Sequence, residues 1–119
     1  MTPLGLRLRQ LRAERGVTLK QMAGALGVSS AYLSALEHGR RGKPTWMLLQ
    51  RTIHYFNVIW DEAEELQRLA EMSDPKITID TAGMAPEATE LANRLARDIG
   101  RLGPDDLVFI SNEVVKRAR

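Results

Sequence analysis

The stretch TLKQMAGALGVSSAYLSALEHG, residues 18–39, decides how the first half of this chain folds. Thr18 and Gln21 have the spacing of a capping box, in which two side chains satisfy backbone N–H groups at the start of a helix. This helix closes at Gly27, and Ser29 can cap a second helix after a turn of only a few residues. Gly27 can take the left-handed backbone conformation of such a turn at little cost. The stretch therefore predicts two short helices joined by a tight turn.

Three further helices are predicted around this pair. Thr2-Pro3 is typical of a helix start, and leucines at helical spacing continue that helix over residues 3–15. Pro44-Thr45 opens a fourth helix, and Asp61 can cap a fifth. Residues 1–72 are therefore expected to form a bundle of five helices. Four aromatic side chains are expected in its core rather than on an exposed stacking surface: Trp46, Tyr55, Phe56 and Trp60.

The second half of the chain, residues 73–119, has a different pattern. Residues 76–80 alternate apolar and polar side chains and are rich in β-branched residues, which predicts a short strand. Pro86 can begin a helix with an apolar stripe, and a last helix is predicted from about Asp105.

This second segment has no large core of its own to enter, so we expect it to form the interface of a homodimer, with the strands pairing between subunits. The expected interface residues are Ile77, Ile79, Leu91, Leu95, Ile99 and Leu102. The alternative, in which the two helices pack back on the first half of their own chain, stays open.

The charge is divided unevenly between the two halves. Residues 1–60 carry nine Lys or Arg and two acidic residues, a net charge of +7. Residues 61–119 carry eight basic and thirteen acidic residues, a net charge of −5. A basic half joined to an acidic half is expected when only the first half meets a polyanion. A solvated charged surface is the alternative.

Several other kinds of site are not supported by the composition. The 119 residues are about one domain in size and include no cysteine, which excludes disulfides and thiolate metal sites. Two isolated histidines do not make a metal site, so none is expected. The sequence has no glycine-rich phosphate loop and no nucleophile with a matched base, so we expect neither an enzyme nor a cofactor. No apolar run approaches the roughly 18 residues that would span a bilayer, and a cytoplasmic location is expected by default.

Between about Leu6 and Phe56 the sequence resembles the lambda-repressor, Cro and Xre family of helix-turn-helix transcriptional regulators. The residues that carry the resemblance are Leu8, Leu11, Arg12, Gly16-Val17-Thr18, Ala23, Gly27-Val28-Ser29, Leu33, Leu36-Glu37, Gly39 and Pro44. The resemblance implies an all-α class: a five-helix lambda-repressor-like DNA-binding domain over residues 1–72, followed by a short strand and a two-helix dimerisation segment over residues 73–119. It also implies a dimeric repressor that places the helix over residues 29–38 in the major groove of double-stranded operator DNA.

The resemblance assigns a role to individual residues of this sequence. The expected contacts to base edges are Ser30, Ala31, Ser34 and Ala35. The expected contacts to the DNA backbone are Thr18, Lys20, Gln21, Ser29, Tyr32, Arg40, Arg41 and Lys43. Arg12 and Glu37 resemble the buried ion pair that links the first helix of the family to its recognition helix.

Two residues depart from what the family and helix propensity favour. Leu19 stands where many members have a glutamine that touches the DNA backbone. Gly24 lies inside a helix, which costs about 1 kcal/mol relative to alanine and is expected to reflect tight packing. The recognition positions also hold small side chains, so we expect modest direct base readout supplemented by DNA shape.

Two other functions fit the same sequence. The first is an antitoxin, whose acidic second half would wrap a basic toxin while the first half regulates its own operon. The second is a helical protein-interaction adaptor that has lost DNA binding, and the basic loop at residues 40–43 argues against it.

Overall fold

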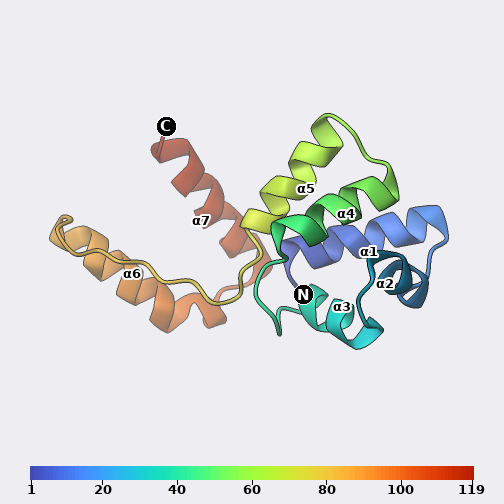
Figure 1. The fold of residues 1–119 in the computed structure, drawn as a ribbon. Coiled ribbons are helices and arrows are strands. Elements are labelled where there is room, and N and C mark those ends of the chain that lie inside the picture. Colours follow the sequence, from blue (N-terminus) through green and yellow to red (C-terminus); the bar gives the residue numbers. More distant parts are fainter. The chain divides into compact units, whose positions relative to one another are not determined.

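The computed structural model describes residues 1–119 and contains seven α-helices, one short 3₁₀ helix and no β-strand (Figure 1). The predicted all-α class is confirmed. The chain divides into two compact units, Met1–Ile77 and Thr78–Arg119.

Five helices form the first unit: α1 (Pro3–Arg15), α2 (Leu19–Leu26), α3 (Ser30–Glu37), α4 (Trp46–Phe56) and α5 (Asp61–Glu71). Four of them begin at a Ser or Thr whose side-chain oxygen accepts a hydrogen bond from a backbone N–H of the first turn. These four residues are Thr2, Thr18, Ser29 and Thr45. The starts of these helices therefore follow from capping chemistry that is visible in the sequence.

The core of the first unit is built mainly from leucine. In α1 the buried leucines lie three or four residues apart, so they share one face of the helix. This helix packs against α3 and α5, while α2 packs against α3 and α4. The fully apolar core residues are Leu4, Leu8, Leu11, Met22, Ala23, Leu26, Leu33, Leu36, Leu48, Leu49, Phe56, Val58, Leu66 and Ala70.

Two of the four aromatic predictions were wrong. Phe56 is buried and Tyr55 is half-buried, but Trp46 is 69% exposed and Trp60 is 80% exposed. The buried face of α4 is centred on Leu48 and Thr52, so a side chain at position 46 lies outside it. Trp60 belongs to the loop before α5, where no neighbouring helix covers it.

The start of α5 also differs from the prediction. Asp61 is the first helical residue, and the capping position belongs to Trp60, which makes no side-chain capping bond. Trp60 has a φ of 53°, in the region that residues with a Cβ rarely adopt. Asp61, Glu62 and Glu64 still lie in the first turn, where the helix dipole favours negative charge.

Gly24 does not mark tight packing, contrary to the expectation. A Cβ built on this residue would have no heavy atom within 4 Å, and the position is exposed. Nothing in the packing of α2 therefore requires a glycine there.

The second unit contains α6 (Pro86–Asp98), a 3₁₀ turn (Ile99–Arg101) and α7 (Pro104–Arg117). The predicted strand at residues 76–80 is wrong for this chain, because those residues form no regular structure. A strand needs a partner for its backbone hydrogen bonds, and the partner expected for this segment is the same segment of a second subunit. No residue of α6, the 3₁₀ turn or α7 is buried. None of the helices is both long and apolar enough to cross a membrane.

Candidate nucleic-acid interface

The centre of the candidate interface is the pair α2 and α3. The capping box at Thr18 is complete: the Gln21 side chain accepts from the Thr18 N–H at 2.9 Å, and Thr18 Oγ1 accepts from the Gln21 N–H at 3.0 Å. Gly27 ends α2 with a φ of 74°, and the next N–H, of Val28, donates to the carbonyl of Ala23 at 3.0 Å. This turn is the left-handed helix ending that the sequence predicts.

One face of α3 is buried and the other is accessible. Leu33, Leu36 and Glu37 enter the interior. The four predicted base-contacting residues lie off this buried face. Ala31 is exposed, whereas Ser30, Ser34 and Ala35 are half-buried. Together they form a surface of short side chains, which allows another molecule to approach the helix closely.

A second accessible region consists of the loop between α3 and α4, which we call the basic loop (residues 40–43). Arg40, Arg41 and Lys43 are all exposed. The Arg41 guanidinium lies 5.5 Å from the centre of the Tyr32 ring, a cation–π contact that leaves its charge in place. Lys43 Nζ lies 3.0 Å from Glu71 Oε2. The basic loop therefore follows directly after the accessible helix and places three cations beside it.

The other predicted backbone-contacting residues lie at the starts of the two helices. Thr18, Lys20, Gln21 and Ser29 are exposed, and Tyr32 is half-buried. Their neighbouring N–H groups stand at the positive ends of α2 and α3, which favour anions. The side chains of Thr18, Gln21 and Ser29 also serve as helix caps.

A buried ion pair fixes α3 on α1, as predicted. Arg12 Nη2 donates to Glu37 Oε1 at 3.0 Å and Arg12 Nη1 donates to Glu37 Oε2. The whole residues are only 9% and 2% exposed. Arg12 Nη1 also lies 3.5 Å from the sulfur of Met22, so the same guanidinium touches α2. A bidentate pair of this kind holds both helices in a defined orientation.

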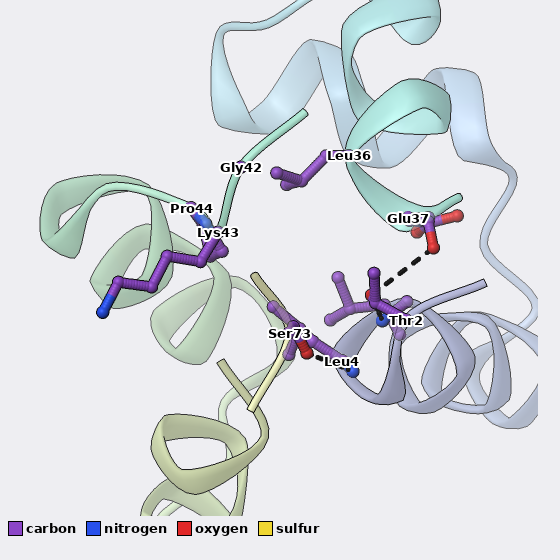
Figure 2. A pocket seen from close by; sticks show the side chains of 10 residues that line it. Thr2, Leu4, Leu36, Glu37, Gly42, Lys43, Pro44 and Ser73 are labelled. Atoms are coloured by element: carbon purple, nitrogen blue, oxygen red, sulfur yellow. Dashed lines mark hydrogen bonds between the residues drawn. The ribbon is translucent and has the colours of Figure 1, made fainter. Parts of the chain in front are cut away.

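Sequence inspection missed a second link between α1 and α3. Gly5 is buried, and a Cβ added there would lie 2.2 Å from the backbone oxygen of Glu37. The two backbones touch at this point, and Thr2 N–H donates to the same oxygen at 2.9 Å (Figure 2). A glycine inside a predicted helix was the available signal, because glycine costs about 1 kcal/mol relative to alanine there, and close packing is one reason for a helix to contain it.

Ser73, which follows the end of α5, also contacts the start of α1. Its Oγ accepts a hydrogen bond from the Leu4 N–H at 2.9 Å (Figure 2). The same hydroxyl donates to the carbonyl of Leu69. Leu4 N–H is one of the first helical donors of α1 and has no acceptor within that helix. Ser73 therefore supplies an acceptor for an amide that would otherwise lack one.

Comparisons with known proteins agree with this geometry. A family model described as a helix-turn-helix domain matches residues 3–69. The HTH-type transcriptional repressor RghR of Bacillus subtilis (strain 168) is 29% identical over 132 aligned positions, which cover 99% of this chain and 98% of the repressor.

Two shorter matches fall on regulators of the same kind. The uncharacterized HTH-type transcriptional regulator RghRB of Bacillus subtilis (strain 168) is 48% identical over 44 residues, 37% of this chain and 32% of that protein. The HTH-type transcriptional regulator DdrOP3 of Deinococcus deserti is 62% identical over 34 residues, 29% of this chain and 26% of that protein. The chain belongs to the helix-turn-helix domain family of DNA-binding transcription regulators.

Proposed function

We propose that this protein is a cytoplasmic repressor that binds operator DNA as a homodimer, with α3 of each subunit in the major groove. The observation that carries the proposal is the accessible face of α3 followed directly by the basic loop. A helix whose accessible face carries short side chains fits into the groove, while adjacent cations neutralise phosphates.

In this proposal the base contacts come from Ser30, Ala31, Ser34 and Ala35. Serine hydroxyls can donate to or accept from base edges, and an alanine methyl can touch the methyl group of thymine. None of the four makes the bidentate contact that arginine or glutamine would make. We therefore expect modest discrimination by direct contact, with DNA shape adding the rest.

The backbone contacts come from the helix starts and the basic loop. These residues are Thr18, Lys20, Gln21, Ser29, Tyr32, Arg40, Arg41 and Lys43. Phosphate contacts of this kind fix the position of the protein and contribute affinity for DNA of any sequence. Repression, rather than activation, is favoured by the name of the full-length relative RghR, which is called a repressor.

The second unit supports dimerisation because it lacks a core. Several large apolar side chains of the predicted interface are exposed by half or more of their area: Ile79, Leu91 and Ile99 in the second unit, and Ile77 at the end of the first. The other two predicted residues, Leu95 and Leu102, are half-buried. Exposed apolar side chains gathered on so short a segment are typical of a protein interface.

The charges of α7 favour a second copy of this chain as the partner. Asp105 and Asp106 lie in its first turn, and Lys116 and Arg117 lie in its last turn. Two copies of α7 lying antiparallel would place each acidic end against the basic end of the other. The exposed apolar residues Val108, Phe109, Val114 and Val115 lie between these ends and would be covered by the same pairing.

The DNA-binding part of the proposal is tested with DNA from upstream of the protein's own gene. Binding is measured at two salt concentrations for the wild type and for Arg40→Ala/Arg41→Ala. We expect a steep salt dependence that becomes shallower by about two charges per bound subunit in the variant. Arg94→Ala/Arg97→Ala, which removes two arginines from α6, is the matched control. Failure of the wild type to bind at low salt would refute the proposal.

The dimer part is tested by sedimentation equilibrium. Leu91→Glu/Ile99→Glu places two charges on the exposed stripe of α6 and should shift the dimer toward monomer. Met47→Glu, at an exposed methionine of α4, should leave the mass unchanged. Asp106→Lys and Lys116→Asp should each weaken the dimer, and the combination should restore it. A dimer insensitive to all these changes would show that another surface holds the subunits together.

A further inference from the structure

The three cations of the basic loop are not equally free to meet DNA. Arg40 forms no ion pair, and Arg41 lies over a neutral ring. Lys43 is different, because its Nζ lies 3.0 Å from a carboxylate oxygen of Glu71, 28 residues later in the chain. A phosphate that approaches Lys43 therefore meets a negative charge at the same place.

The location of Glu71 is unfavourable for its own helix. It is the last residue of α5, where the partial charge of the helix end is negative. The acids Asp61, Glu62 and Glu64 occupy the favourable first turn instead. Glu71 therefore does not stabilise α5 through the helix dipole, and Arg68 is the last-turn residue of the suitable sign.

The pair between Lys43 and Glu71 also contributes little to the stability of the fold. The two side chains are 44% and 68% exposed, and exposed ion pairs of this kind contribute on average between zero and about 1 kcal/mol. The consequence of the pair is electrostatic: it cancels one of the three positive charges of the basic loop.

We infer that Glu71 restrains the DNA affinity of this protein by competing with phosphate for Lys43. This inference rests on the proposed function. Binding through Lys43 must either break the pair or hold the Glu71 carboxylate close to the DNA backbone. Because phosphates carry no sequence information, the restraint acts on operator and unrelated DNA alike.

The test compares Glu71→Gln with Glu65→Gln. Glu65 belongs to the same helix and also forms an exposed ion pair, since Arg68 Nη2 donates to its Oε1 at 2.8 Å. The hydrogen bond from Arg68 lowers the pKa of Glu65 from its ordinary value, which already lies well below neutral pH. Both variants therefore remove one charge from α5, but only Glu71→Gln frees a cation of the basic loop.

Binding to the upstream DNA and to unrelated DNA of equal length is measured between 50 and 200 mM salt. Glu71→Gln should make the salt dependence steeper by about 0.9 per bound subunit. Its gain in affinity over the wild type should therefore grow about 3.5-fold per bound subunit, or about 12-fold for a dimer, from 200 to 50 mM. Glu65→Gln should show no such growth. In a Lys43→Gln background, Glu71→Gln should give no further gain in DNA affinity. The melting temperatures of all variants serve as the check of folding.

Three results separate the possibilities. If the gain in DNA affinity for Glu71→Gln is no larger than that for Glu65→Gln, the inference is overturned. The proposal that the protein binds DNA would not be affected by this result. A gain that persists with Lys43→Gln would overturn it too, because the effect would then come from overall charge. If the wild type and both glutamate variants fail to bind at 50 mM salt, the proposed function itself is wrong and the inference falls with it.

Discussion

Replacing Glu37 with methionine would leave the Arg12 guanidinium in the interior without its carboxylate partner. Arg12 would lose both of its hydrogen bonds to Glu37 and keep only the contact to the Met22 sulfur. Breaking a buried pair from one side costs about 3–5 kcal/mol, because the remaining charge is desolvated and unpaired. A small domain has roughly 5–15 kcal/mol of total stability, so Glu37→Met should remove a large share of it.

The measurement is urea denaturation followed by far-ultraviolet circular dichroism. Glu65→Met is the matched control, because it breaks an ion pair whose side chains are exposed and should cost no more than about 1 kcal/mol. The double variant Arg12→Met/Glu37→Met removes both charges and fills the same space with apolar groups. Its stability should return close to that of the wild type, since paired replacement of buried charges is often neutral.

Two outcomes would contradict this reasoning. Equal losses for Glu37→Met and Glu65→Met would mean that burial does not raise the cost of an unpaired charge here. A double variant as unstable as Glu37→Met would mean that shape, rather than the isolated charge, causes the loss. In either case the link between α1 and α3 would have to depend mainly on their apolar contacts.

Three further substitutions test other contacts of the first unit by thermal unfolding. Gly5→Ala should lower stability by about 1–3 kcal/mol, because its Cβ would lie 2.2 Å from the Glu37 carbonyl oxygen, and an unchanged melting temperature would contradict that contact. Gly24→Ala should raise stability by about 1 kcal/mol, because no atom lies in the way and alanine favours the helix; a loss would reveal packing there. Ser73→Ala should cost about 1–3 kcal/mol, because the Leu4 N–H loses its acceptor, whereas a neutral result would show that water replaces it.

The helices of the first unit could be predicted because their starts depend on local chemistry. The side chain at Ser29 caps the backbone N–H of Tyr32, three residues later, and the Thr18 box works over the same distance. The family resemblance added the pair between Arg12 and Glu37, which no local pattern would have shown. The predicted DNA contacts lie on accessible positions and stay predictions.

The errors of prediction arose where the outcome depends on distant parts of the chain. Helical spacing placed Trp46 on the apolar side of its helix. The neighbouring helices instead cover the face that is centred on Leu48 and Thr52. The β-branched pattern at residues 76–80 describes a segment that could pair, whereas pairing requires a second strand. Gly5 was missed because its role depends on a backbone that lies 32 residues away in sequence.

The absence of any buried residue in α6 and α7 has a thermodynamic consequence. Helices of 13 and 14 residues are marginal in water by themselves, so their folding must be coupled to whatever covers them. If subunits cover each other, mass action makes their helix content depend on protein concentration. Dilution should then melt the second unit while the leucine core of the first stays folded, so that the amount of this protein in a cell sets how much of each molecule is structured.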